Sequence, residues 1–178
     1  MAAKTLAIIQ ARMSSSRLPG KVLLDLAGQP VLQRVVSRLR RASLLDEVLV
    51  ATTTDSSDDA LAQFCEEQSI LCSRGSVFDV LDRYYQAAQL SKAELIVRVT
   101  ADCPMIDPGE VDRVIRAFMQ SDADFAANRL PPPFVRSTPI GMDTEVVTRA
   151  GLERAWKEAR EAYEREHVMP YFYAVPGR

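Results

Sequence analysis

The sequence predicts an α/β protein with a Rossmann-like, mostly parallel sheet and helices on both of its faces. Short apolar runs, typical of buried parallel strands, alternate along the chain with stretches whose apolar residues recur at helical spacing. The chain has 178 residues, of which 47% are hydrophobic and 26% are charged. This length and composition predict a single domain over residues 1–178 with one sizeable core.

The first half of the chain shows the alternation most clearly. Strands are predicted at residues 5–10, 47–52, 70–72 and 95–100. Pro30 suits the first position of a helix whose apolar stripe includes Val31, Val35 and Leu39, because the backbone N–H at that position has no partner within a helix. Polar residues 53–58 offer an N-cap for a helix that runs to about residue 68, and another helix is predicted over 77–90. This order predicts parallel strands connected by crossover helices.

The second half is less regular. Asp107 and Glu110 have capping-box spacing before a helix that runs to about residue 119, so Asp107 is expected to be structural. Further elements are predicted as strands at 124–128 and 141–147 and a helix at 149–162. In the second strand, alternation puts Asp143 and Glu145 on one face. Prolines 131–133 predict an extended arm over the sheet edge, which could cover a sugar or meet a partner subunit.

A cationic loop follows the first strand. It carries Arg12, Arg17 and Lys21 and turns at Pro19-Gly20, whereas no acidic residue precedes Asp25 in a chain of net charge −2. In an open α/β sheet, ligands bind beyond the carboxyl ends of the strands. Arginine can grip two phosphate oxygens at once, and lysine adds a compact point charge. The loop therefore predicts a polyphosphate site. The alternative is a solvated basic loop with ordinary salt bridges.

Two common phosphate-binding motifs are absent from this loop. A P-loop requires glycine where Ser15 stands and serine or threonine where Val22 stands. A dinucleotide fingerprint requires three glycines, and Gly20 is the only one here.

Two residues at other strand ends could join this site. Asp102 follows the strand at 95–100, opposite the cationic loop, where a carboxylate could hold Mg²⁺ together with phosphate oxygens and water. The alternative is an ordinary turn aspartate. Arg74 follows the strand at 70–72 at the same edge, where either a nucleotide contact or a structural salt bridge is expected.

The run from Ala11 to Lys21, A-R-x-x-S-x-R-L-P-G-K, resembles the nucleotide-binding loop of sugar-activating cytidylyltransferases. Further similar segments follow in order at 51–54, 79–85, 102–108 and 165–171. The chain is most similar to the spore-coat polysaccharide cytidylyltransferase family, and more distantly to CMP-Kdo and CMP-sialate synthetases. The resemblance implies a nucleotide-diphospho-sugar transferase fold. It also implies transfer of CMP from CTP to a sugar or sugar acid, with release of pyrophosphate, in surface polysaccharide biosynthesis.

The loop chemistry and the resemblance together assign roles to individual residues. The expected catalytic residues are Arg12, Lys21 and Asp102, with Asp102 as the Mg²⁺ ligand. The nucleotide is expected to contact Ala11, Arg12, Ser16, Arg17, Lys21 and Arg74. The acceptor sugar is expected to contact Asp143, Glu145 and His167. For Glu145 a solvated position, and for His167 a structural hydrogen bond, are the alternatives.

Composition restricts the other partners. The mildly acidic total argues against a nucleic-acid binder, and no segment has the apolar length of a membrane span. Three cysteines without metal-ligand spacing suit reduced thiols in a cytoplasmic protein. A homodimer is compatible with the proline-rich arm and with the resemblance.

The resemblance also implies further elements beyond residue 178, including a second metal-binding carboxylate, so the chain is expected to be shortened relative to the family. One alternative function is therefore binding of a nucleotide or a partner without catalysis. Another is nucleotidyl transfer with a different base or to a polyol phosphate.

Overall fold

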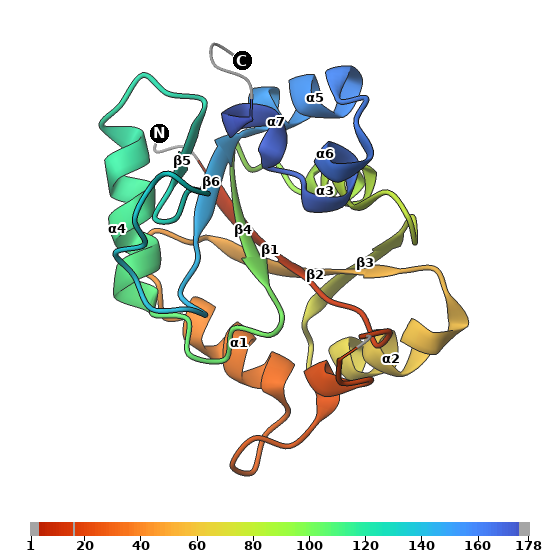
Figure 1. Ribbon diagram of the computed structural model, residues 1–178. Coiled ribbons are helices and arrows are strands. Elements are labelled where there is room, and N and C mark those ends of the chain that lie inside the picture. The colour runs from red at the N-terminus through yellow and green to blue at the C-terminus, as the bar shows by residue number, and fades with distance from the viewer. Residues whose placement is uncertain (1–3, 16, 175–178) are drawn as a thin grey trace.

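A six-stranded sheet forms the centre of the computed structural model, which describes residues 4–15 and 17–174 (Figure 1). The strand order is β3-β2-β1-β4-β6-β5. The strands are β1 (Thr5–Gln10), β2 (Glu47–Thr53), β3 (Leu71–Gly75), β4 (Leu95–Thr100), β5 (Phe125–Ala127) and β6 (Glu145–Thr148). The first four pair in parallel, whereas β6 is antiparallel to both β4 and β5. The predicted Rossmann-like fold is confirmed.

Helices cover both faces of the sheet (Figure 1). One face packs against α1 (Val31–Leu39), α2 (Asp59–Glu67) and α4 (Pro108–Met119). The other packs against α3 (Val80–Gln89), α5 (Arg149–Glu158) and α7 (Pro170–Tyr173), with α6 (Ala162–His167) against α3. Two short 3-10 helices, η1 (Lys21–Leu23) and η2 (Ser56–Asp58), lie in loops.

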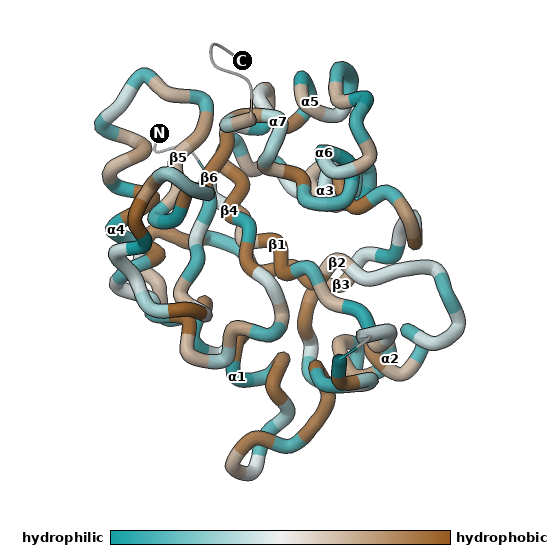
Figure 2. Tube along the Cα trace, viewed as in Figure 1, coloured by the Kyte–Doolittle hydropathy of each residue, from teal (hydrophilic) through white to brown (hydrophobic). Residues whose placement is uncertain are grey.

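The central strands are apolar because both of their faces are covered. In β1, Ala7 and Ile9 enter the core under α1 and α2, and Leu6 and Ile8 enter the core under α3. All four side chains are inaccessible to solvent. Figure 2 shows hydrophobic residues running along β1 and β4. Two cores, one on each face, therefore hold these strands in place.

Several element boundaries differ from the sequence prediction. Helix α3 begins at Val80 rather than at residue 77, because the Asp79 carboxylate accepts a hydrogen bond from the backbone N–H of Asp82 at 2.8 Å and caps the helix there. Strand β6 begins at Glu145, after a turn in which Gly141 has a φ of 91°. The prediction that Asp143 and Glu145 share one face of the same strand was therefore wrong, since Asp143 lies in the loop before β6.

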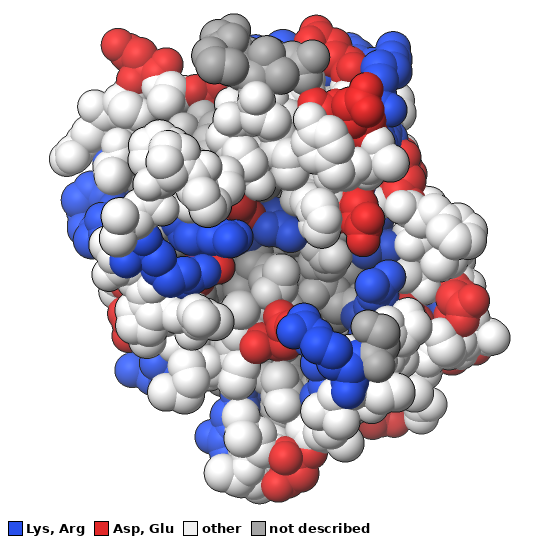
Figure 3. All heavy atoms as spheres, viewed as in Figure 1, with Lys and Arg blue, Asp and Glu red and all other residues white. Residues whose placement is uncertain are grey.

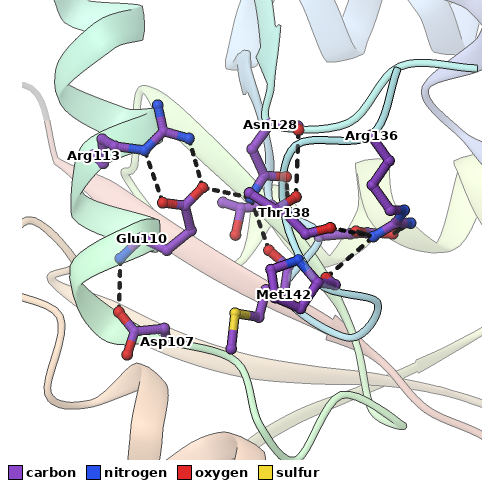
Figure 4. Close-up of polar contacts among 10 residues, drawn as sticks. Asp107, Glu110, Arg113, Asn128, Arg136, Thr138 and Met142 are labelled. Carbon is purple, nitrogen blue, oxygen red and sulfur yellow. Dashed lines mark hydrogen bonds and ion pairs between the residues drawn. The ribbon is translucent and has the colours of Figure 1, made fainter. Parts of the chain in front are cut away.

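The segment between β5 and β6 forms the predicted extended arm at the sheet edge, beside α4 (Figure 1). Asn128, at the start of the arm, connects the arm to α4 and to the arm's other end. Its side-chain amide donates to Glu110 of α4 at 2.9 Å and to the carbonyl of Met142 at 2.8 Å (Figure 4). Arg136 then pairs with Asp143 across the arm. Within the part of the chain that the structure describes, no helix is long and apolar enough to cross a bilayer.

We expect replacement of Asp107 by alanine to lower the free energy of unfolding by about 1 kcal/mol. Asp107 accepts a hydrogen bond from the N–H of Glu110 at 3.0 Å and caps α4, as the sequence predicts. Urea unfolding monitored by circular dichroism measures the change. Asp122→Ala, in the exposed loop after α4, serves as the control and should change stability by much less. Equal stability of the two variants would contradict the capping role.

Candidate active site

The candidate site lies between β1 and β4, where the strand order of the sheet reverses. From β1 the chain proceeds to β2 on one side, and β4 borders β1 on the other, so the loops after β1 and β4 leave a crevice between them. Gln10 pairs with Thr100 in the last register position of these two strands. A cavity of about 210 Å³ opens there. It is lined by Gln10, Ala11, Arg12, Ser15, Arg17, Lys21, Val22, Thr100, Ala101 and Asp102.

The cationic loop folds back on itself at Met13. The carbonyl of Met13 accepts hydrogen bonds from the N–H groups of Ser15 at 2.9 Å and Gly20 at 2.8 Å. Gly20 has a φ of 70°, a left-handed conformation that glycine adopts without steric cost. The loop closure brings Arg12, Arg17 and Lys21 to the rim of one cavity, as expected for a polyphosphate site.

Lys21 and Asp102 form an ion pair across the mouth of this cavity. Burial by itself would raise the pKa of the Asp102 carboxyl, but hydrogen bonds from Lys21 and Thr100 outweigh it and hold the pKa below its ordinary value of 3.8. Asp102 is therefore an ionised carboxylate at neutral pH. The cavity thus presents cations on one side and a single anion on the other.

The neighbouring Cys103 is not activated as a nucleophile. Burial raises the pKa of its thiol, and its Sγ lies 3.2 Å from the hydroxyl of Thr100. A protonated, buried thiol is a poor nucleophile.

A second cavity of about 180 Å³ adjoins the first, and Thr100 lines both. Its walls are formed by Arg98, Val99, Thr100, Arg129, Asp143 and Glu145. Two of the three predicted acceptor-binding residues are therefore together. Figure 3 shows Lys and Arg side chains gathered around a hollow in the centre of this face, with acidic side chains among them.

Both carboxylates of the second cavity are held by arginines. Arg136 binds Asp143 through two parallel hydrogen bonds of 2.7 and 2.9 Å, and Arg98 pairs with Glu145. Burial alone would lower the pKa of Arg98, but the charge and hydrogen bond of Glu145, together with Tyr84 and Tyr173, outweigh burial and raise the pKa. Arg98 also donates to the side-chain oxygen of Gln10 at 3.3 Å. The two cavities therefore share a polar wall.

Two of the predicted site residues that the structure describes do not line these cavities. Arg74 makes the structural salt bridge that was one of its two expected roles, because its guanidinium pairs with Asp59 at 2.7 Å. His167 is exposed at the end of α6, and neither cavity is lined by it. Ser16 lies outside the described residues.

The sequence analysis missed five polar lining residues, which are Gln10, Ser15, Arg98, Thr100 and Arg129. Gln10 and Thr100 are polar residues at the ends of otherwise apolar strands, a signal that could have identified them. Arg98 is likewise a charge within an apolar strand. Arg129 has no comparable signal, since it stands in an irregular loop that only the fold brings to the cavity.

The described residues around Asp102 could hold Mg²⁺ only together with the phosphate oxygens of a nucleotide. Among residues 4–15 and 17–174, no group of three or more histidine, cysteine or acidic side chains gathers to hold a metal. Mg²⁺ commonly takes one or two carboxylates and fills its other positions with phosphate oxygens and water. A single ionised Asp102 beside a cationic phosphate cradle fits that pattern.

Comparison with known proteins identifies the family. The sequence profile described as "Cytidylyltransferase" matches residues 6–178. The chain belongs to the cytidylyltransferase family. Its members are CTP-dependent nucleotidyltransferases, and this chain is one of them. It is 34% identical to the spore coat polysaccharide biosynthesis protein SpsF of Bacillus subtilis over 175 residues, which cover 96% of this chain and 70% of SpsF.

Solved structures agree with this assignment. A cytidylyltransferase from Leptospira borgpetersenii superposes with a TM-score of 0.86 at 35% identity, covering 95% of this chain and 70% of that one. A CMP:2-keto-3-deoxy-manno-octonic acid synthetase, solved in complex with CTP, superposes with a TM-score of 0.73 at 19% identity. That superposition covers 97% of this chain and 87% of the synthetase, and supports the shared fold.

Removal of Lys21 should raise the pKa of Asp102, because burial would then act with fewer opposing hydrogen bonds. The pKa of Asp102 is lower in the folded protein than its ordinary value of 3.8. The ionised carboxylate therefore adds to the free energy of unfolding above pH 3.8, and this contribution is lost as the pH falls through the folded-state pKa. Carboxyl ¹³C NMR titration of wild type and Lys21→Ala measures the shift. The Asp112 carboxyl, which Ser43 and Leu44 hold instead, should titrate alike in both proteins. An unmoved Asp102 pKa would contradict the assignment.

Proposed function

We propose that this cytidylyltransferase transfers CMP from CTP to a sugar or sugar acid and releases pyrophosphate, in the synthesis of a surface polysaccharide. One observation carries the proposal: the three cations of the loop and the Asp102 carboxylate line a single cavity at the carboxyl ends of β1 and β4. The CTP complex of the synthetase and the printed name of SpsF support the nucleotide and the pathway class.

Arg12, Arg17 and Lys21 bind the triphosphate in this mechanism. The acceptor oxygen attacks the α-phosphorus in line with the departing pyrophosphate, and negative charge builds up on the leaving group. Fixed cations that already face this position stabilise the transition state, because they need no reorganisation during the reaction. Ala11 and Ser16 are proposed to contact the nucleotide from the same loop, and Arg74 from the neighbouring strand.

Asp102 is the residue that would hold Mg²⁺. When bound, the ion would neutralise phosphate charge and would favour loss of the acceptor's proton. Lys21 contacts only one oxygen of Asp102, so the other oxygen is available for the ion, and the ammonium group keeps donors for a phosphate oxygen.

The second cavity is proposed to bind the acceptor. Asp143 and Glu145 are fixed by arginines and keep lone pairs for sugar hydroxyl groups. The exposed His167 is proposed to contact a part of the acceptor that extends out of this cavity. Because CTP is a cytoplasmic substrate, we propose a cytoplasmic location, and a homodimer is proposed through the arm.

Lys21→Ala should reduce turnover by about a hundredfold or more, as expected for the loss of one preorganised electrostatic stabiliser. Pyrophosphate release, measured with a panel of sugar and sugar-acid acceptors, tests this. Lys4→Ala is a matched control, since Lys4 forms a comparable ion pair with Glu47 at 2.7 Å before β1. Turnover similar to that of wild type in a folded Lys21→Ala protein would contradict the role of Lys21.

Calorimetric titration with CTP, in the presence and absence of Mg²⁺, tests the site as a whole. We expect saturable binding that Mg²⁺ strengthens in wild type and in Asp124→Ala, but not in Asp102→Ala. Asp124 pairs with Arg154 at 2.8 Å on the surface, which makes it a suitable control. Titration with ATP, GTP and UTP tests the choice of base. Failure to bind any of the four nucleotides would overturn the proposal and favour a non-catalytic role.

A further inference from the structure

We propose that Asp58 is a positioning residue, which holds the nucleotide-binding loop in its closed conformation without touching the nucleotide. The effect on the loop is independent of the proposed function, whereas the effect on CTP affinity rests on it. Asp58 ends η2, 45 residues away along the chain from the loop residue that it binds.

Asp58 is a buried carboxylate whose exposed fraction is only 1%. One oxygen accepts a hydrogen bond from the backbone N–H of Met13 at 2.6 Å. The other accepts from both the hydroxyl and the backbone N–H of Thr53, the latter at 3.2 Å. Backbone and hydroxyl donors, rather than an ion pair, therefore satisfy this buried charge within the described chain.

The Met13 residue that Asp58 binds is also the closure point of the loop. Its N–H is fixed by Asp58, and its carbonyl accepts hydrogen bonds from Ser15 and Gly20. Arg12 precedes Met13 and Lys21 follows Gly20, so both ends of the cationic segment are fixed at this one peptide. A change at Asp58 therefore acts on the phosphate-binding cations together.

The segment that carries Asp58 is itself rigidly held. The Arg74 guanidinium donates to the carbonyls of Thr53 at 2.8 Å and Asp55 at 2.9 Å, and pairs with Asp59. Arg74 thereby braces the segment that carries Asp58. A rigid acceptor is needed here, because a mobile carboxylate could not select one conformation of the loop.

Loss of the Asp58 carboxylate leaves the Met13 N–H without its partner and allows the loop to sample open conformations. If only a fraction of molecules is closed, the apparent dissociation constant rises by the inverse of that fraction. Loss of a hydrogen bond to a charged group lowers the equilibrium constant between the closed and the open loop by about tenfold to a hundredfold. We therefore expect Asp58→Ala to raise the KM and Kd for CTP by about that factor. At saturating CTP the loop is closed again, so kcat should change by less than about threefold.

Asp112 provides a matched control elsewhere in the same protein. Its carboxylate also accepts two backbone hydrogen bonds across a long sequence separation, from Ser43 and Leu44 at 2.9 Å each. These residues precede β2 and are therefore at the amino edge of the sheet, opposite the cationic loop. Asp112→Ala should lower stability without altering the KM for CTP.

Amide hydrogen exchange and CTP titration of both alanine variants test the proposal. We expect faster exchange at residues 12–21 in Asp58→Ala alone, and a higher KM with a nearly unchanged kcat. Asp58→Asn, which retains one acceptor for the Met13 N–H, should give an intermediate result and serves if the alanine variant does not fold. Exchange at wild-type rates in a folded Asp58 variant would overturn the proposal. If exchange in the loop is faster in the Asp58 variant but the wild-type protein binds no CTP, the role of Asp58 in the loop is supported and only the proposed function is contradicted.

Discussion

The parallel pairing of β1 with β4 is the constraint on which the candidate site depends. The two strands are distant in sequence, yet their register places Gln10 beside Thr100, and the ladder continues from the N–H of Ala101 to the carbonyl of Gln10 at 3.0 Å. Apolar burial on both faces fixes that register, since a slip by one residue would exchange the contents of the two cores. The cationic loop and Asp102 are therefore brought together by the hydrophobic core, and their own attraction adds only a local preference.

Sequence reasoning was accurate wherever one short segment contained the whole signal. The limits of β1 and β4 were predicted correctly, because each strand is a short, mostly apolar run that ends in a polar residue, although Arg98 interrupts the run in β4. The cap of α4 was also predicted, because Asp107 and Glu110 stand at capping distance within that segment. The position of the cationic loop after β1 was also predicted from adjacent residues, and Arg12, Arg17 and Lys21 do line one cavity, whereas their binding of phosphate stays a prediction.

The missed features are those that depend on residues distant in sequence. Glu145 is paired rather than solvated because β6 aligns it with Arg98, which no local pattern indicates. Asp58 looked like part of a polar helix start, and only the fold shows that its carboxylate reaches Met13. The start of β6 was placed too early because alternation continues through a turn, and alternation alone does not distinguish a turn from a strand.

The ion pair between Lys21 and Asp102 has a consequence for how ligands would bind under the proposed function. A triphosphate bound beside this pair would meet the Asp102 carboxylate, and a metal ion would meet the Lys21 ammonium group. Each ligand would offset the repulsion that the other meets, so their binding free energies would be coupled by the same amount in both directions. Under that function, the paired charges would favour binding of the metal–nucleotide complex over binding of either ligand alone.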